Sequence, residues 1–321
     1  MIGSMIGDTI GDRSRFAELV QRHWRELHVH CYRMLGSFDQ AEDLVQETFL
    51  RAWRAREGFD GSPHARAWLY RIATNACLDV LRKRPPPQSL QSVADISWLQ
   101  PYPDRLLDEA APREDEPDAV VVTRESIELA FLAVIQLLPP RQRAVLITRE
   151  VLGWSAAETA ELLDMTVAAI NSALQRARAA LRDHRPEPGT TGSATKPNAE
   201  ESALLERYVR AHSNSDPDAL VRLLRDDIRV TMPPHPMCLD GLDSLTPLLE
   251  RGFHSGEFGE WLLLPTAANR MPAAANYHRA PRDGEFRPYK LDVLRIKDGG
   301  IAEITSFGAS MFPAFGLPQR P

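Results

Sequence analysis

Residues 166–178 hold the side chains of this chain that are best suited to recognising another molecule. Small residues and amides come first in this stretch, and arginines follow. Amides can hydrogen-bond to the edges of bases, guanidinium groups can bind guanine or phosphate, and small side chains let a helix approach closely. The residues concerned are Thr166, Ala168, Ala169, Asn171, Ser172, Gln175, Arg176 and Arg178. Their types and spacing predict a surface that contacts DNA.

Two short helices are predicted to position these residues. Ser155 and Glu158 have the spacing of a capping box, which starts the first helix. From Thr166, a candidate N-cap, apolar residues recur every three or four positions, which is the spacing of one helix face. The expected inward residues are Val167, Ile170, Leu174, Ala177 and Leu181. The pair predicts a helix-turn-helix, whose second helix enters the major groove; an ordinary helix pair with a solvated arginine face is the alternative.

The stretch from Leu138 to Arg182 resembles the promoter-binding domain of bacterial sigma factors. The resemblance is carried by Leu138-Pro139-Pro140-Arg141-Gln142-Arg143-Ala144-Val145-Leu146, Gly153-Trp154-Ser155 and Gln175-Arg176-Ala177-Arg178. It implies that a domain of residues 123–185 reads the −35 promoter element. The exposed residues of the second helix are then the expected contacts to that element.

A second amphipathic segment lies at residues 41–54. Its apolar stripe is Ala41, Leu44, Val45, Thr48, Phe49, Ala52 and Trp53, and its opposite face is charged. By pattern alone that face could simply be solvated. The run Ala41-Glu42-Asp43-Leu44-Val45-Gln46-Glu47-Thr48-Phe49 resembles the helix with which sigma factors bind the coiled coil of the largest RNA polymerase subunit. The resemblance implies that Asp43, Gln46 and Glu47 contact the polymerase.

Residues 64–84 are predicted to form a helix that the prolines at 85–87 terminate. Aromatic and basic residues are interleaved here, as melted DNA requires, although aromatic residues such as Trp68 and Tyr70 are more often core residues than platforms for bases. The segment from Trp68 to Arg82 resembles the part of extracytoplasmic-function sigma factors that reads and opens the −10 element. The resemblance implies that Asn75 contacts a base. The other expected DNA-binding residues of this helix are Arg66, Arg71, Arg82, Lys83 and Arg84.

The chain of 321 residues has a formal net charge of −6, and much of the acidity lies in residues 85–122. The segments 1–84 and 123–185 are close to neutral, so we expect weak DNA binding by the chain alone. The sigma factor resemblance implies that the acidic linker lies in a channel that later holds RNA. Its apolar residues suggest instead that it docks on a folded surface, such as the C-terminal domain. These residues are Trp98, Leu99, Tyr102, Leu106 and Leu107.

Cysteine content and hydropathy exclude several classes of protein. Cys31, Cys77 and Cys238 lie far apart in the sequence, which argues against a zinc site and against disulfides. No apolar run approaches the roughly 20 residues that span a bilayer, and the first residues do not form a signal peptide. We therefore expect a cytoplasmic protein with no metal, no cofactor and no membrane partner.

Residues 198–318 are predicted to form a further domain after a flexible linker at 186–197. Two helices, an extended run at 228–232 and a short helix precede alternating stretches that predict strands, so the fold class is α+β. Lys297-Asp298-Gly299-Gly300 predicts a tight hairpin turn. The order resembles the SnoaL-like group, a cone-shaped fold with an internal pocket in which some members use an acid/base pair. Candidates for such a pair are Asp240, His235, His254, Tyr277 and Tyr289, but no spacing singles out two of them.

The sequence therefore predicts a multidomain protein with two all-α sigma domains, at residues 13–84 and 123–185, followed by an α+β SnoaL-like cone domain. The leading hypothesis is an RNA polymerase sigma factor that binds core polymerase and promoter DNA. Its SnoaL-like domain would contact the sigma domains or the linker and modulate their activity. A SnoaL-like enzyme fused to a DNA-binding module is one alternative. A helix-turn-helix repressor that binds its operator without polymerase is another.

Overall fold

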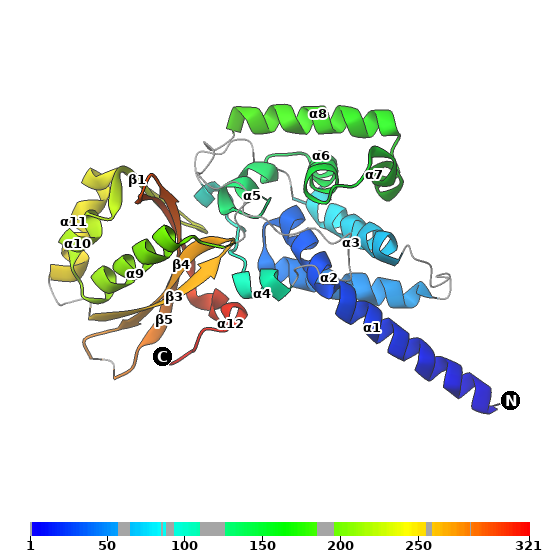
Figure 1. The fold of residues 1–321 in the computed structure, drawn as a ribbon, viewed down its shortest axis with the longest axis horizontal. Coiled ribbons are helices and arrows are strands. Elements are labelled where there is room, and N and C mark those ends of the chain that lie inside the picture. Colours follow the sequence, from blue (N-terminus) through cyan, green and yellow to red (C-terminus); the bar gives the residue numbers. More distant parts are fainter. Residues whose placement is uncertain are drawn as a thin grey trace. The chain divides into compact units, whose positions relative to one another are not determined.

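A computed structural model describes most of the chain, in two compact units that we call unit 1 and unit 2 (Figure 1). The described residues are 2–56, 65–84, 86–87, 93–109, 126–184, 196–254, 259–282 and 284–321. Unit 1 comprises Met1–Pro86, Glu109–Val120 and Leu138–Ala180. Unit 2 comprises Pro87–Asp108, Val121–Leu137 and Leu181–Pro321.

The first part of unit 1 consists of α1 (Ile2–Leu35), α2 (Phe38–Arg54) and α3 (Ala65–Arg82). Helix α1 extends further toward the N-terminus than the predicted start at Arg13. Gly36, with φ of 73°, ends it in a left-handed conformation that glycine adopts without strain. Ser37 then caps α2, because its Oγ accepts a hydrogen bond from the Gln40 amide at 3.4 Å.

The core between these helices follows the apolar stripes of the sequence. On α2 the buried residues are Phe38, Ala41, Val45, Thr48, Phe49 and Ala52. On α3 they are Leu69, Tyr70, Ala73, Thr74, Ala76, Cys77 and Leu81. Cys31 and Cys77, which are distant in the sequence, interact here as free buried thiols. Burial and the neighbouring Cys31 raise the pKa of Cys77, so its thiol stays protonated.

The second part of unit 1 contains α6 (Pro140–Leu146), a π-helical turn (Ile147–Val151) and α7 (Ala156–Leu163), followed by α8 (Val167–His184) up to Ala180. Helices α6 and α7 pack against α3. Arg143 on α6 is 2% exposed, and its Nη1 donates to the Met34 carbonyl at 2.5 Å while Nη2 donates to the Leu138 carbonyl at 3.2 Å. Burial lowers the pKa of Arg143 to about 9. This arginine therefore stabilises unit 1 rather than contacting DNA.

Unit 2 is built on a six-stranded sheet with the order β2-β1-β6-β5-β4-β3. The strands are β1 (Leu224–Met232), β2 (His235–Asp240), β3 (Glu260–Ala268), β4 (Met271–Arg279), β5 (Arg287–Lys297) and β6 (Gly300–Gly308). Neighbours pair antiparallel except β1 and β6, which are parallel. The predicted hairpin joins β5 to β6, with Asp298 and Gly299 at positive φ. Strand β2 was not predicted, because Pro236 interrupts its sequence pattern.

Helices of unit 2 cover the sheet and connect its strands. They are α9 (Ala199–Ser213), α10 (Pro217–Val221), α11 (Leu242–His254) and α12 (Phe312–Phe315). Helix α9 packs against β3 and β4 (Figure 1). Leu204, Leu205 and Tyr208 on its inner side join a buried apolar core with residues of the strands. Burial of this stripe, rather than helix propensity, is what holds α9 on the sheet.

Two segments that precede the C-terminal domain in sequence also belong to unit 2. The first contains a 3₁₀ turn (Val93–Asp95) and α4 (Asp104–Glu109) up to Asp108, and the second contains α5 (Leu129–Gln136). The sequence predicted no regular structure in the first segment, because its helices are too short to give a periodic pattern. Several predicted features lie outside the described residues. They are the start of the second sigma domain at Thr123, most of the linker 186–197, His64 and the side chain of His254.

Candidate nucleic-acid interface

The helix-turn-helix begins with the capping box that the sequence predicted. Glu158 N donates to Ser155 Oγ at 3.1 Å, and Ser155 N donates to Glu158 Oε2 at 2.7 Å. Helix α7 ends at Asp164, whose φ of 53° reverses the chain. Thr166 then caps α8, because its Oγ1 accepts from the Ala169 amide at 3.2 Å. These local hydrogen bonds fix where α8 starts and therefore which of its residues come first.

The two sides of α8 differ as its sequence pattern predicted. The buried residues are Ile170, Ala173, Leu174 and Ala177. The opposite side consists of Thr166, Ala168, Asn171, Ser172, Gln175, Arg176 and Arg178, which are exposed, and of Ala169, which is half-buried. The structure thus brings all eight predicted DNA-binding residues of this helix together on one accessible face.

Both arginines on this face have partners that orient them. Arg176 Nη1 donates to Ser172 Oγ at 2.6 Å, one turn earlier on the helix. Arg178 Nε donates to Glu150 Oε1 at 2.5 Å. Because both groups are exposed, such contacts are worth little in free energy and can be exchanged for a phosphate. They hold the guanidinium groups near the helix without making them unavailable.

Val167 departs from the prediction. It was expected on the inward side of α8, but 45% of its surface is exposed. Val167 is the first residue of α8, and burial on this helix begins only at Ile170. Ala173, which the sequence pattern did not assign to the inward side, is buried there. An exposed valine at this end of a recognition helix can contact the methyl group of thymine. We therefore add Val167 to the candidate interface.

On α3 the structure separates the predicted residues into two groups. Arg71 and Asn75 are exposed one turn apart on the same side of the helix. Arg82 and Lys83 are also exposed at its C-terminal end, where Arg82 Nη2 pairs with Asp79 Oδ1 at 3.0 Å. These four residues form an accessible polar side of α3.

The other two predicted residues, Arg66 and Arg84, are half-buried and bonded to other helices of unit 1. Arg66 Nε donates to Glu26 Oε2 at 2.8 Å, and its guanidinium lies 5.3 Å from the centre of the Tyr70 ring. Arg84 Nη2 donates to Gln40 Oε1 at 2.6 Å, and burial lowers the pKa of Arg84. The sequence could not reveal these partners, because each lies about forty residues away in the chain.

Tyr70 is a core residue rather than a platform for a base. It is 1% exposed, its hydroxyl donates to Glu26 Oε2 at 3.2 Å, and its ring lies 5.2 Å from that of Trp154. Burial raises the pKa of Tyr70 far above its ordinary value. Trp68 is half-buried. Of the two aromatic residues considered for base stacking, only Trp68 keeps a face that DNA could reach.

The predicted polymerase-binding residues lie on the outer side of α2. Asp43 and Gln46 are exposed, and Glu47 is half-buried. Glu47 Oε1 accepts from Arg51 Nε at 2.8 Å, and Arg51 also lies 3.7 Å from Asp79 on α3. These pairs form a surface of alternating charge, which is suited to a polar contact with another protein.

In unit 2 the proposed acid/base candidates do not converge. Asp240 pairs with Arg229 at 2.6 Å on the exposed surface, and His235 is exposed on the same strand. Tyr277 is buried and donates its hydroxyl to the Pro318 carbonyl at 2.8 Å. Tyr289 is 52% exposed. The described residues of this set therefore form no catalytic pair.

A buried polar cluster that the sequence analysis missed lies around Asp292 on β5. This fully buried carboxylate accepts hydrogen bonds from Tyr208 at 3.0 Å, Asn276 at 2.9 Å and Ser306 at 2.5 Å. Lys290 lies 3.0 Å away. Burial alone would raise the pKa of Asp292, but Lys290, Ser306 and the nearby His212 lower it on balance. The signal in the sequence was one carboxylate between Leu291 and Val293, in a strand whose other charged residues are all basic.

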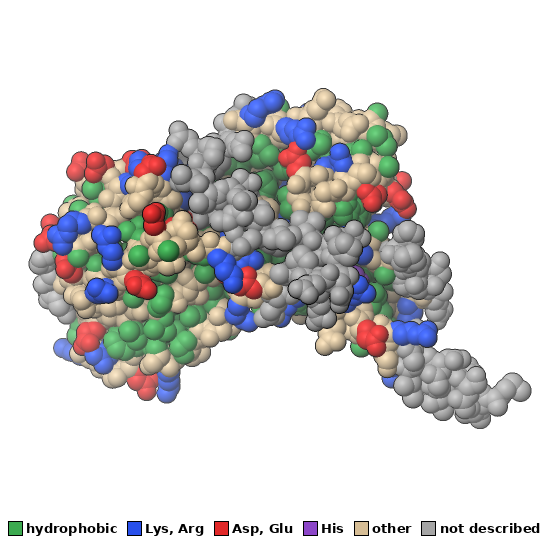
Figure 2. Space-filling view, in the orientation of Figure 1, with side chains coloured by type: hydrophobic (Ala, Val, Ile, Leu, Met, Phe, Trp, Pro, Cys, Tyr) green, Lys and Arg blue, Asp and Glu red, His purple; other side chains and the backbone are tan. Residues whose placement is uncertain are grey.

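Metal-binding clusters and membrane spans were also sought in the described part of the chain. Its His, Cys, Asp and Glu residues include no group of three that could hold a metal ion. None of its helices is both long and apolar enough to cross a bilayer. Figure 2 shows basic and acidic side chains interspersed on the face that it draws, rather than one large basic field.

Comparison with known proteins places these helices in a family. The sequence matches sigma-70 region 2 over residues 19–85 and sigma-70 region 4 over residues 128–181. It is 41% identical over 324 residues to the ECF RNA polymerase sigma factor SigG of Mycobacterium tuberculosis, covering 96% of this chain and 85% of SigG. It is 35% identical over 175 residues to SigW of Bacillus subtilis, covering 54% of this chain and 89% of SigW.

The fold has a relative among solved structures. The crystal structure of the extracytoplasmic-function sigma factor SigJ of Mycobacterium tuberculosis matches with a TM-score of 0.61 at 21% identity, covering 95% of this chain and 99% of that one. Helical sigma regions followed by an α+β domain are thus an arrangement that occurs elsewhere. Together with the match to SigG along 85% of its length, the two sigma regions show that the chain belongs to the extracytoplasmic-function (ECF) family of RNA polymerase sigma factors.

Proposed function

We propose that this ECF sigma factor binds core RNA polymerase through α2, opens the −10 promoter element with α3 and reads the −35 element with α8. Proteins of this family direct RNA polymerase to promoters and are not enzymes. They act with cytoplasmic machinery, so the proposed location is the cytoplasm. The residue assignments below give the proposal its detail.

The exposed face of α8 supports the proposal most strongly. Its N-terminal half presents Asn171, Ser172 and Gln175, which can bond to base edges in the major groove, and Val167 for a thymine methyl. Its arginines lie one turn further on, where phosphates flank the groove. Base contacts at the start of the helix with phosphate contacts behind them are the arrangement of a helix-turn-helix on DNA.

On α3, Asn75 is the proposed base contact, and Arg71, Arg82 and Lys83 are the proposed phosphate contacts. Arg66 and Arg84 would reach DNA only by giving up their bonds to Glu26 and Gln40. On α2, Asp43, Gln46 and Glu47 are the proposed contacts to polymerase.

Reading both promoter elements requires unit 1 to open. The −35 and −10 elements lie about 25 base pairs apart, or roughly 85 Å along the duplex. In unit 1 the helices that would read them belong to one compact body, with Arg143 bonded to the Met34 carbonyl and the Trp154 ring against Tyr70. We infer that binding to core polymerase separates α6–α8 from α1–α3.

The connecting segment offers a route for the C-terminal domain to control this opening. Asn269, in the turn between β3 and β4, bonds to two points of the connection. Its Oδ1 accepts from Tyr102 N and its Nδ2 donates to the Ile127 carbonyl, both at 2.7 Å. Asn269 N also donates to the Tyr102 carbonyl at 2.9 Å. The turn residue thus holds the chain both before and after residues 110–125.

The next residue in the turn, Arg270, adds a charged contact. It is 3% exposed, its amide donates to Asp104 Oδ1 at 2.8 Å, and its Nη1 lies 2.5 Å from Asp108 Oδ1. Burial would raise the pKa of Asp108, but Arg270 and Lys196 lower it, so the carboxylate stays charged. Leu99, Tyr102 and Leu107 of the same segment are buried. A docked connection has less reach than a free chain, and we propose that the C-terminal domain modulates transcription in this way.

Run-off transcription with purified core polymerase tests the sigma factor activity. We expect promoter-dependent transcripts from genomic templates when the full chain is added to core polymerase. If no template gives such a transcript and the chain does not bind core polymerase in a pull-down, the proposal is wrong. Tight binding to an operator without polymerase would instead favour a repressor.

A turn variant tests the role of the C-terminal domain. Asn269→Gly keeps the left-handed conformation of this residue, whose φ is 55°, but removes both side-chain bonds to the connection. Asp298→Gly is the matched control in the exposed β5–β6 turn. We expect Asn269→Gly to change transcription in the same direction as a chain that ends near Arg185, and Asp298→Gly to have no effect. If only the truncation changes transcription, the connection is not the route.

A further inference from the structure

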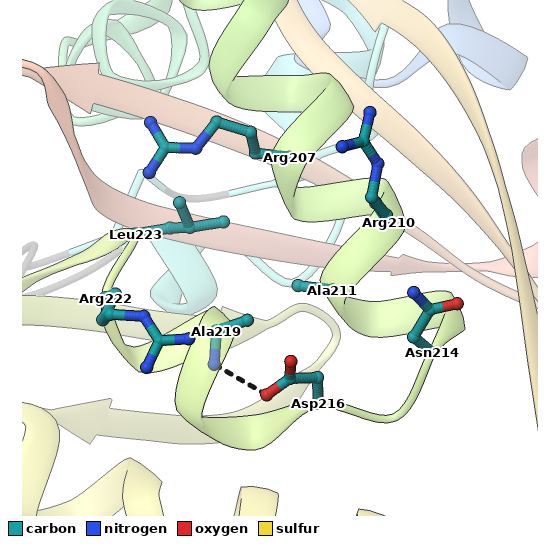
Figure 3. Close-up of a pocket in the computed structure, with 8 residues that line it drawn as sticks. All are labelled: Arg207, Arg210, Ala211, Asn214, Asp216, Ala219, Arg222 and Leu223. Carbon is teal, nitrogen blue, oxygen red and sulfur yellow. Dashed lines mark hydrogen bonds between the residues drawn. The ribbon is translucent and has the colours of Figure 1, made fainter.

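A concave pocket opens where α9 and α10 meet. Its volume is about 290 Å³, at the lower end of the range for small-molecule sites. Figure 3 shows Arg207 and Arg210 projecting from α9, Arg222 coming from the end of α10, and Asn214 at the end of α9. Basic groups thus surround the opening from two helices.

The three arginines of the pocket have no acidic partners in the described part of the chain. None of them forms an ion pair with a carboxylate among the residues that the structure describes. By contrast, Arg225 and Arg229 pair with aspartates at 2.8 Å and 2.6 Å. The three side chains bring like charges to the rim of one hollow (Figure 3), and an anion bound there would be attracted to all of them.

The single acidic residue in the pocket has a structural role. Asp216 Oδ1 accepts a hydrogen bond from the Ala219 amide at 2.9 Å and so caps α10 (Figure 3). Three arginines and one aspartate leave a formal charge of +2 on the lining. The pocket therefore retains an excess of positive charge that Asp216 does not neutralise.

The backbone beneath the pocket is fixed by its own hydrogen bonds. Asn214 N donates to the Arg210 carbonyl at 3.0 Å, and Asp216 N donates to the Ala211 carbonyl at 2.9 Å. Ala211 and Leu223 are buried and form an apolar floor. The arginines thus extend from helices whose junction is held by backbone hydrogen bonds, and little backbone order has to be created when a ligand binds.

We propose that this pocket binds a small molecule that carries a phosphate group. Arginine forks match the oxygens of a phosphate, and several of them suit a dianion better than a single carboxylate. The apolar floor and the Asn214 amide can receive a small organic body attached to that phosphate. A nucleic acid backbone presents many phosphates along a groove, whereas this hollow is small and is lined by two short stretches of chain.

Binding is tested with the full chain by calorimetry, using inorganic phosphate, glucose 6-phosphate and unphosphorylated glucose as probes. We expect saturable binding of the phosphorylated probes and none of glucose. Tighter binding of glucose 6-phosphate than of inorganic phosphate would identify a phosphate ester as the ligand, and equal binding would identify free phosphate. If neither phosphorylated probe binds, the proposal is overturned.

Variants separate a built site from diffuse attraction. Arg207→Gln, Arg210→Gln and Arg222→Gln should each weaken binding at least about tenfold, because each removes charge-assisted hydrogen bonds. Arg282→Gln removes one exposed charge elsewhere in unit 2 and should leave binding unchanged. Equal losses in all four variants would overturn the proposal. So would a result in which only a single-stranded oligonucleotide binds through these arginines. None of these outcomes bears on the run-off transcription test.

Discussion

Units 1 and 2 use their polar side chains in opposite ways. In unit 1, the amides and arginines of α8 are exposed, and their few partners are surface contacts. In unit 2, the carboxylate of Asp292 is fully buried and bonded to residues of α9 and two neighbouring strands. Exposed polar groups are free to recognise a partner, whereas buried ones must be paired and thereby contribute to folding. Substitutions in the two regions should therefore have separable effects on transcription and on stability.

The largest effect is expected from Asp292→Ala. It removes the acceptor of the buried cluster and leaves Lys290 without its carboxylate, which should lower the free energy of unfolding of unit 2 by about 3–5 kcal/mol. Urea unfolding, monitored by hydrogen exchange in peptides from unit 2, measures the change in the free energy of unfolding. Asp292→Asn, which keeps the shape and one acceptor, should lose less. A loss under about 1 kcal/mol for the alanine variant would show that the cluster does not hold unit 2 together.

Acidification should weaken unit 1 through two buried histidines of α1. Burial, with Arg25 near His28 and Arg33 near His30, lowers the pKa of each to about 3. Both are neutral when folded, so their contribution is fully present above the unfolded pKa of about 6.5 and is lost as the pH falls from there toward 3. By pH 5 the loss should be about 2 kcal/mol per histidine.

Urea unfolding of the full chain between pH 7 and pH 5 checks this expectation. His28→Gln and His30→Gln should flatten the pH dependence of unit 1 peptides in hydrogen exchange. In unit 2, burial lowers the pKa of His212 to about 4. The stability of unit 2 should therefore also fall as the pH is lowered, through this single histidine. If the stability of unit 1 stays constant down to pH 5, His28 and His30 are not buried and neutral as described.

Substitutions on the exposed face of α8 should affect promoter recognition without affecting folding. Asn171→Ala and Gln175→Ala should each reduce transcription roughly tenfold, because each removes a contact to a base edge worth about 1–3 kcal/mol. Glu161→Ala, an exposed change on α7, is the control. Run-off assays on promoters altered in the −35 element measure the change. Unchanged transcription with both variants would place the recognition surface elsewhere.

The smallest effects should separate two arginines of α3. Arg66→Ala removes the pair with Glu26 and should lower the free energy of unfolding by about 1 kcal/mol, since the pair is partly shielded from water. Arg71→Ala should leave the free energy of unfolding unchanged but should reduce open-complex formation. The slope of log binding constant against log salt concentration should also become shallower, by the contribution of about one phosphate contact. The reverse pattern would show that Arg66 is the DNA contact.

Local patterns in the sequence were sufficient for the helix-turn-helix. Ser155, Glu158 and Thr166 act through neighbours three residues away, so their capping roles could be inferred without a structure. The Asp298-Gly299 turn was predicted for the same reason. Strand β2 was missed because Pro236 interrupts its sequence pattern, and α4 was missed because six residues are too few to show a helical period. Val167 was misplaced because the period of a helix does not say where burial begins.

The sequence by itself determined the helical faces, the hairpin turn and the positions of the residues suited to DNA, because these depend on neighbours within a few residues. The tertiary structure alone decided which of those residues are available. Glu26 engages Arg66, the Met34 carbonyl engages Arg143, and Asn269 engages the connection between the sigma regions. Contacts over such separations in sequence follow from packing, which no local pattern of residues specifies.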